Sequence, residues 1–122
     1  MSNRFVVTIT HATDDPDKAT VGMVIANAAA ASGKETLVFL SNEGVRLAAV
    51  GFGAGIAQDG FASMMDLLAN FAAAGGTLLV CTPCAKVRGV DTAELVAGAK
   101  LGGGAGLVEF MTAEGAVASV SY

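Results

Sequence analysis

The chain has 122 residues and no Pro-rich or Ser-rich linker, so we expect one domain over residues 1–122 with a sizeable hydrophobic core. A formal net charge of -4 at pH 7, no basic cluster and no tryptophan argue against a nucleic-acid ligand. No segment reaches the roughly 18 consecutive apolar residues of a membrane span, and the first residues lack a signal-peptide pattern, so we expect a cytoplasmic protein.

Strand-like and helix-like patterns alternate along the chain. Asp15 before Pro16 is typical of a helix N-terminus, and the alanine-rich stretch that follows predicts a helix ending at Gly33, a residue that suits a left-handed cap. Residues 91–106 mix helix and strand signals and stay open. In chain order we expect strand 4–10, helix 16–33, strand 35–40, a short helix capped by Ser41 or Asn42, a flexible glycine-rich flap at 51–60, helix 61–76, strand 77–81, a short helix at 83–88, helix 106–115 and strand 116–122.

The helix expected at 61–76 carries large apolar side chains at helical spacing, and we interpret its methionines and phenylalanines as plain core. The glycines before it do not predict a phosphate-binding loop, because no G-K-S/T sequence follows them. The spaced residues are Phe61, Met64 or Met65, Leu68 and Phe71 or Ala72.

Strands that alternate with helices and read as continuous apolar runs predict an α/β domain, with a mostly parallel sheet of about five strands and helices on both faces. Right-handed crossovers bring the C-terminal ends of parallel strands to one edge, where ligands bind. The segments 11–15, 41–44 and 81–84 should therefore share one mouth.

The only two cysteines, Cys81 and Cys84, lie three positions apart at the end of the third clear strand. In a reducing compartment such a pair is typical of reactive or metal-binding thiols rather than of a structural disulfide. A helix start near the sulfurs, together with Lys86 and Arg88, favours a thiolate. The alternative is structural: Cys81 is then a buried strand residue and Cys84 a small core hydrophobe.

Two other readings of the pair are weaker. A structural zinc site needs three or four ligands, and the pair with His11 supplies three at most, so we expect no metal. The local C-x-P-C sequence resembles the thioredoxin redox motif. However, it follows the third strand, whereas the thioredoxin pair follows the first βα pattern.

The segment "VCTPCAKVRGV", an apolar strand ending in cysteine with arginine and glycine seven and eight positions later, resembles the DsrE/DsrF-like superfamily, which includes TusD-type sulfur-relay subunits and YchN-like proteins. The similarity extends to "THATDDPDKATVGMVIANAAAASGKETLVFLSNEGVRLA", with its threonine-rich loop, alanine-rich helix and "SGKE" turn, and to the closing "AVASVSY". Together these motifs cover nearly the whole chain.

This resemblance implies a small cytoplasmic α/β protein that assembles as a trimer or hexamer, alone or with related sister subunits. In the sulfur-relay members the cysteine at the strand end carries persulfide sulfur, and that cysteine matches Cys81. Cys84 matches a second cysteine of some YchN-like relatives that the TusD type lacks. Cys81 would then accept and pass on sulfane sulfur, or Cys84 would resolve it by closing a disulfide.

Other candidate binding residues follow the same strand ends. His11 could accept a proton from a thiol, and Glu43 at the end of the second strand suits the first turn of a helix. Backbone N–H groups at Thr82, Cys84 and Ala85 could stabilise a Cys81 thiolate, so we expect Cys81 to react before Cys84.

The sequence leaves the function classes open. The first is a sulfurtransferase or sulfur carrier using Cys81, with a sulfur donor or acceptor protein as partner. The second is a non-catalytic oligomeric module that binds a small ligand or only assembles, and the third is a thiol-disulfide oxidoreductase using Cys81 and Cys84. None of them calls for a cofactor. Since 53% of residues are hydrophobic and 15% charged, we expect a homo-oligomer that covers apolar surface.

Overall fold

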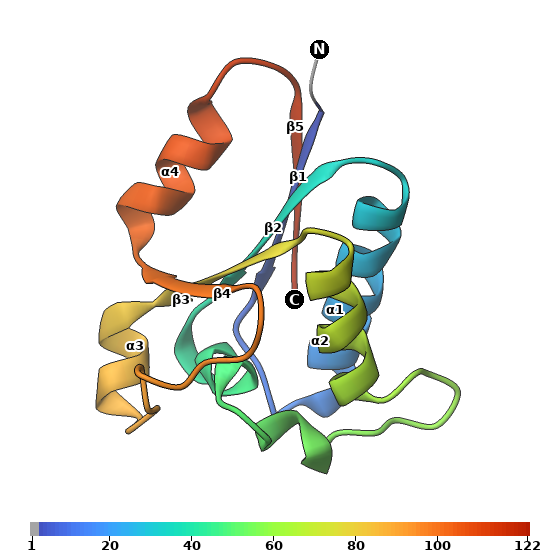
Figure 1. Ribbon diagram of the computed structural model, residues 1–122, viewed down its shortest axis with the longest axis vertical. Helices are drawn as coiled ribbons and strands as arrows, with labels where there is room; N and C mark the ends of the chain where they lie inside the picture. Colours follow the sequence, from blue (N-terminus) through green and yellow to red (C-terminus); the bar gives the residue numbers. More distant parts are fainter. Residues whose placement is uncertain (1–2) are drawn as a thin grey trace.

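The β-branched and leucine-rich runs of the sequence form one sheet of five parallel strands in the computed structural model, which describes residues 3–122 (Figure 1). The strand order is β4-β3-β2-β1-β5. The expected α/β class and the number of strands are therefore confirmed. The strands are β1 (Arg4–Ile9), β2 (Glu35–Leu40), β3 (Thr77–Cys81), β4 (Ala99–Gly102) and β5 (Val117–Ser121).

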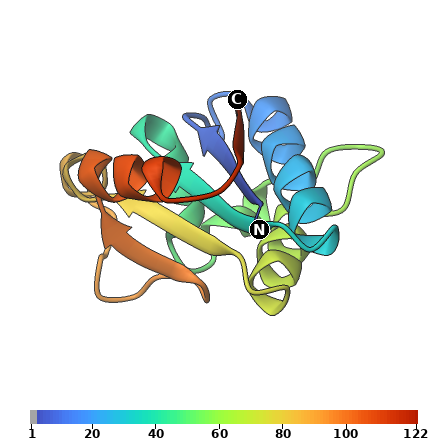
Figure 2. The ribbon, with the colours of Figure 1, turned by 90° about the horizontal axis from the view of Figure 1, so that it is seen from above.

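Helices cover both faces of the sheet, as expected. Helices α1 (Pro16–Ala31) and α2 (Met64–Ala73) pack on one face, and α4 (Gly104–Thr112) lies alone on the other (Figure 2). The short helix α3 (Thr82–Val87) and the 3-10 helices η1 (Asn42–Ala48) and η2 (Phe52–Gly55) follow the strand ends. The connections between parallel strands thus place η1 and α3 at the same edge of the sheet.

The start of α1 follows from its sequence. The side chain of Asp15 accepts a hydrogen bond from the backbone N–H of Lys18 at 3.2 Å, and Pro16 occupies the first helical position. Beyond the helix, Gly33 has a φ of 82°, a left-handed conformation that glycine adopts without strain. The helix boundaries expected from these residues are therefore confirmed to within two residues.

Side chains alternate between two cores along each central strand. The larger core lies between the sheet and the α1–α2 face, and it includes Ile9, Leu40, Val80, Met23 and Phe71. The smaller core lies under α4, where Val6, Leu37 and Leu79 meet Leu107, Phe110 and Met111. No residue of α4 is buried, so this helix covers its face only thinly.

Arg4 holds α4 against the start of β1. Its side chain is 5% exposed and donates hydrogen bonds from Nε to the carbonyl oxygen of Phe110 at 2.9 Å and from Nη2 to that of Ala113 at 2.6 Å. Nη1 donates to the carbonyl oxygen of Glu114. These carbonyls lie at or beyond the helix C-terminus, where a cation is favourable.

Three local expectations need correction. Helix α2 begins at Met64 rather than at residue 61, because the Ser63 hydroxyl accepts the N–H of Asp66 at 3.2 Å and caps the helix there. Phe61 lies before the helix and is 45% exposed, and Met65 on its first turn is 42% exposed, so neither is core. Met64 and Phe71 are buried, as expected. The glycine-rich segment contains a 3-10 turn and is anchored by Ile56, which is 1% exposed.

The structure also settles the short helix expected after Ser41 and the open region 91–106. The short helix expected after Ser41 is the 3-10 helix η1, and Ser41 is its cap residue without a side-chain hydrogen bond. The open region 91–106 supplies β4, so its "LVAGAKL" sequence ends in a strand rather than a helix.

Candidate functional site

The edge at which the parallel strands end brings η1 and α3 into contact (Figure 1). Gly44 of η1 packs so closely on β1 that an added Cβ would overlap the carbonyl oxygen of Ile9. The Gly44 N–H donates to the carbonyl oxygen of Ser41 at 2.9 Å, and the Ser41 N–H donates to that of Ile9 at 3.2 Å. The start of η1 is thereby fixed to the end of β1.

Both cysteines are free, half-buried and in contact with one another at this edge. Cys81 ends β3 and is the residue before α3, while Cys84 lies within α3. The thiol of each cysteine acts on the pKa of the other, and the backbone N–H groups of Cys84 and Asn42 act on the pKa values of Cys81 and Cys84 respectively.

These contacts separate the acidities of the two thiols. Burial, followed by the hydrogen bond to Cys84, raises the pKa of the Cys81 thiol. The hydrogen bond from Cys81, followed by the N–H of Asn42, lowers the pKa of the Cys84 thiol. The two shifts have opposite directions and share one cause, the hydrogen bond between the two thiols. Which of the two cysteines reacts first stays a prediction.

Asn42 contributes through its backbone. It is the one non-glycine residue with a positive φ among residues 3–122, at 54°, and its side chain is exposed. Asparagine tolerates this left-handed conformation better than most residues. From the sequence, Asn42 is expected only as a helix cap, although the preference of asparagine for left-handed backbone is a signal that singles it out.

A cluster of three charged side chains reaches the pair through Arg88. Glu43 accepts hydrogen bonds from Arg46 Nε at 2.8 Å and Arg88 Nε at 2.5 Å. These bonds, Arg46 first and Arg88 second, lower the pKa of Glu43. Arg88 Nη1 also donates to the carbonyl oxygen of Cys84 at 3.2 Å, and its charge lowers the pKa of both thiols.

The other candidate residues have different surroundings. The Thr82 hydroxyl donates to the carbonyl oxygen of Gly102 at 2.9 Å and fastens β4, while the Lys86 side chain is exposed on α3. His11 Nδ1 pairs with Asp14 Oδ2 at 2.7 Å. Because β2 lies between β1 and β3, the loop that holds His11 starts about 10 Å from the cysteine loop. The structure therefore unites segments 41–44 and 81–84 but not His11.

Within residues 3–122, no three His, Cys, Asp or Glu side chains group as metal ligands. The site offers thiol chemistry, because two neighbouring thiols beside a guanidinium can supply a nucleophile and a proton source. None of the helices in the described part of the chain is long and apolar enough to cross a membrane.

A sequence model of the DsrE/DsrF-like family matches residues 3–117. No curated protein matches the chain. The ychN protein from E. coli has a similar structure, with a TM-score of 0.78, 18% identity, and coverage of 98% of this chain and 100% of its own. Two proteins described as of unknown function are also similar. MTH1491 from Methanobacterium thermoautotrophicum gives a TM-score of 0.72, 14% identity and coverage of 100% of both chains. BT1422 from Bacteroides thetaiotaomicron gives a TM-score of 0.64 and 16% identity, with coverage of 96% of this chain and 94% of its own.

Proposed function

The chain belongs to the DsrE/DsrF-like family, and from this membership we propose that it handles sulfane sulfur, holding it as a persulfide on Cys81 and passing it on from there. The observation that carries the proposal is the hydrogen-bonded contact between two free, half-buried cysteines at the ligand-binding edge of the sheet. The proposal includes a cytoplasmic location, because a reducing compartment keeps a pair of thiols of this kind free.

The loading step needs a thiolate and a donor that carries sulfane sulfur, such as a low-molecular-weight persulfide R–S–SH. The thiolate attacks the outer sulfur, the donor S–S bond breaks, and the leaving R–S⁻ takes up a proton. The protein gains one sulfur atom as Cys–S–SH. Delivery repeats the same exchange with an acceptor thiol, so no oxidant or reductant is consumed.

Intact mass measurement tests this function. The reduced protein is incubated with cysteine persulfide at neutral pH, desalted and weighed. We expect a gain of one sulfur atom that a Cys81→Ser/Cys84→Ser double variant lacks, and we expect an added acceptor thiol to remove it. A wild-type protein that never gains sulfur would contradict the function and favour a non-catalytic binding or assembly module.

A disulfide between the two cysteines is the mark of the oxidoreductase alternative. The same contact that permits sulfur transfer also places the two thiols for oxidation. Equilibration across glutathione buffers measures that reaction directly. A pair that stays reduced while it loads sulfur supports the carrier.

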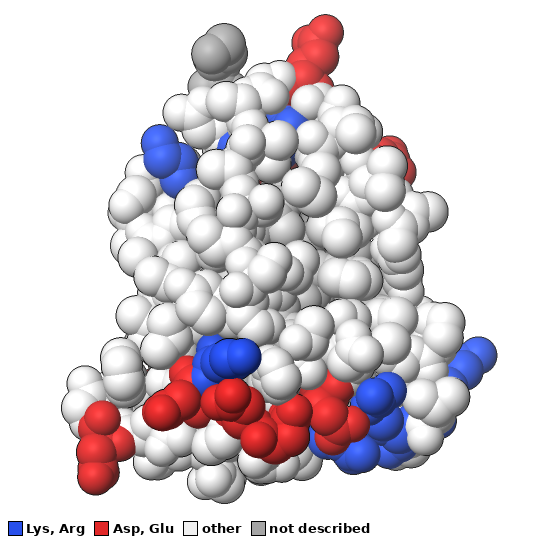
Figure 3. Space-filling view, turned by 180° about the vertical axis from the view of Figure 1, so that it is seen from behind, with Lys and Arg blue, Asp and Glu red and all other residues white. Residues whose placement is uncertain are grey.

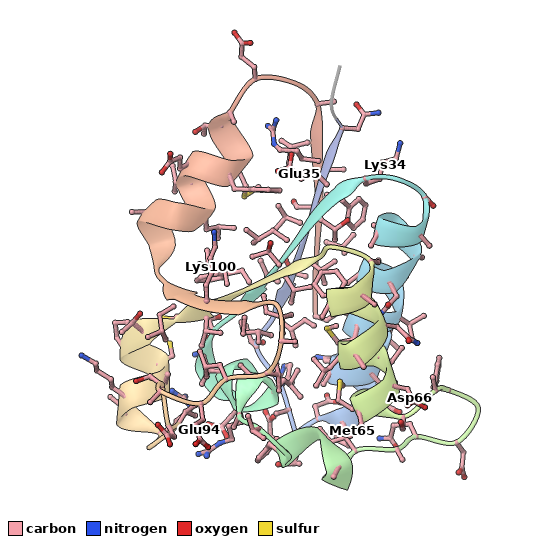
Figure 4. All side chains as sticks on the ribbon, in the orientation of Figure 1. Lys34, Glu35, Met65, Asp66, Glu94 and Lys100 are labelled. Atoms are coloured by element: carbon pink, nitrogen blue, oxygen red, sulfur yellow. The ribbon has the colours of Figure 1, made fainter. Side chains whose placement is uncertain are left out.

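The proposal includes assembly into a homo-oligomer, a trimer or hexamer. An apolar groove of about 340 Å³ runs between α2 and residues 95–97, and two of its lining residues, Val50 and Met65, are 63% and 42% exposed. Met65 and Asp66 lie on the first turn of α2, at the same end of the molecule as Glu94 (Figure 4). From behind, charged side chains gather along the end where the strands finish and leave a wide uncharged area (Figure 3). The exposed apolar side chains of the groove, Val50 and Met65, favour a partner.

A further inference from the structure

We infer that the groove between α4 and the sheet binds the organic part of the sulfur donor, and that this donor is a small persulfide with both a carboxylate and an ammonium group. Lys100 holds the carboxylate and Glu109 holds the ammonium, while the persulfide sulfur reaches Cys81. This inference rests on the proposed sulfur-handling function and assigns a substrate class to its site.

The groove is built from α4 and from strands β2, β3 and β4. Its volume is about 340 Å³, in the range of pockets that hold small ligands. The floor is apolar, and the rim carries one cation and one anion. The floor residues are Leu37, Leu79 and Phe110, and the charged rim residues are Lys100 and Glu109.

The two charged side chains indicate what the groove binds. Both are exposed, and neither joins an ion pair among residues 3–122. Lys100 extends from β4 toward α4, the helix that carries Glu109 (Figure 4). Because opposite charges lie on the two sides of one groove, they complement a zwitterion better than a simple anion or cation. The persulfide of an amino acid or a short peptide has both charges and a carbon chain for the apolar floor.

Strand register connects the groove to Cys81. On β3, Cys81 follows Leu79 by two positions, and the paired residues on β4 are Gly102 and Lys100. Side chains two positions apart share a face of the sheet, so the groove and Cys81 lie on the same face, about 7 Å apart along β3. Packing agrees, because a Cβ at Gly102 would overlap the side chain of Leu79. The Thr82 hydroxyl, bonded to the carbonyl oxygen of Gly102 at 2.9 Å, holds the end of β4 beside this strand end.

The turn from β4 into α4 leaves the route to Cys81 free of side chains. Gly103 and Gly104 have no left-handed φ, and a Cβ added to either would have no atom within 4 Å. Neither the backbone nor the packing therefore requires glycine at these two positions. Gly104 lies in the first turn of α4, where alanine would be the better helix former. A passage for the donor gives both glycines a function.

The reaction is the loading step of the proposed function with a bound donor. The Cys81 thiol gives up its proton, the thiolate attacks the outer sulfur of R–S–SH, and the donor S–S bond breaks. R–S⁻ takes up a proton and leaves the groove as a free thiol. One S–S bond replaces another, so no oxidant or reductant is consumed. A donor held at both charged groups presents its sulfur in one place.

Loading rates over a series of donor concentrations test the groove. Cysteine persulfide and glutathione persulfide both carry the two charges, and the one that half-saturates at the lower concentration shows which size fits. In Lys100→Met we expect half-saturation at about fivefold to tenfold higher concentration with a similar maximal rate, because only a binding contact is lost. Glu109→Gln should act in the same direction. Lys34→Met removes an exposed cation before β2 and should match the wild type, whereas wild-type half-saturation in Lys100→Met would overturn the inference.

Filling the groove is an independent test. A Cβ at Gly106 would lie 3.4 Å from the Leu79 side chain, an ordinary contact, so Gly106→Leu occupies the groove without moving the backbone. We expect this variant to load more slowly from both persulfides, while the small neutral reagent iodoacetamide labels the cysteines at the wild-type rate. Gly55→Leu is the matched control, because its added Cβ meets nothing within 4 Å. Unchanged loading in Gly106→Leu would contradict the site.

Binding without sulfur transfer separates this inference from the proposed function. S-methylglutathione and S-methylcysteine carry the same charges but no transferable sulfur, and amide NMR shifts report where they bind. We expect shift changes at residues 100–113 of the wild type that are weaker in Lys100→Met. If these changes occur and no persulfide loads the protein, the proposed function is wrong and the zwitterion site stands. If loading has the same concentration dependence in every variant and the shifts stay unchanged, the function stands and the site is wrong.

Discussion

Arg88 joins two elements that follow different strands. Its Nε donates to Glu43 Oε2 on η1 at 2.5 Å, while its Nη1 donates to the carbonyl oxygen of Cys84 on α3 at 3.2 Å. A single guanidinium group thus sets the distance between the helix that holds the Asn42 N–H and the helix that holds the Cys84 sulfur. A planar group with donors in fixed directions can do this, whereas an ammonium group cannot.

Removal of this charge should make both thiols weaker acids. In Arg88→Gln the pKa values of Cys81 and Cys84 rise, because the guanidinium lowers both in the wild type. The thiolate fraction at neutral pH then falls, and alkylation should slow by about threefold to tenfold. Rates measured over a pH series check this. Arg88→Lys keeps the charge, so its alkylation rate should lie between those of the wild type and Arg88→Gln. Equal pH midpoints of alkylation in all three proteins would refute the prediction.

Gly44 should tolerate no side chain. A Cβ there would overlap the carbonyl oxygen of Ile9, so Gly44→Ala must displace η1 and is expected to lower the free energy of unfolding by about 1–3 kcal/mol. The displacement also withdraws the Asn42 N–H and should raise the pKa of Cys84. Gly55→Ala is the matched control, because nothing lies within 4 Å of its added Cβ. Urea unfolding of both variants decides whether the close packing matters.

Arg4, on the N-terminal strand β1, should stabilise the C-terminal helix α4. Arg4→Met leaves the carbonyl groups at the end of α4 and beyond it without their donor, and we expect a loss of about 2–3 kcal/mol in unfolding free energy. Amide hydrogen exchange should accelerate in α4 before it does in α1. Lys34→Met, which replaces an exposed cation, should leave both measurements unchanged. Equal exchange of α4 in wild type and Arg4→Met would rule out the capping role.

Assembly should be visible in sedimentation. At micromolar concentration the wild type is expected to sediment as a trimer or hexamer of 12.1 kDa chains. Val50→Glu places a charge in the apolar groove and should shift the distribution toward the monomer. Ala31→Glu, at an exposed position at the end of α1, is the control. A monomeric wild type would contradict the proposed oligomer.

Asp14 should contribute a small, pH-dependent stability. The Ala12 N–H, and to a lesser degree His11, lower the pKa of this carboxyl group. Its folded pKa is below the unfolded value, so its stabilisation is complete above the unfolded pKa and is lost as pH falls through the folded pKa. Asp14→Asn should cost about 0.5 kcal/mol at neutral pH, because the group is exposed, and nothing at strongly acidic pH. Unfolding curves at several pH values test the sign.

Sequence reasoning succeeded where one residue and its near neighbours decide the structure. Asp15 and Pro16 set the start of α1 through a local cap, and continuous apolar runs identified the central strands. It failed at Phe61. Helical spacing continues through residue 61, but the helix begins only after the cap residue Ser63. Within the site, the pattern placed Cys81, Cys84 and Arg88 together with Glu43. The contact from Asn42 depends on a backbone conformation that no spacing reveals.

The order of strands in the sheet also bears on how the chain folds. β1 lies between β2 and β5, and the hydrogen bond from the Thr8 hydroxyl to the Ser121 hydroxyl spans 113 residues of sequence. Pairing over such separations must close a long loop before it gains any contact, so a high contact order slows folding. During synthesis the first strand made is left with one edge unpaired until the last strand emerges from the ribosome. In that interval the edge of β1 that β5 will cover is open to pairing with other chains.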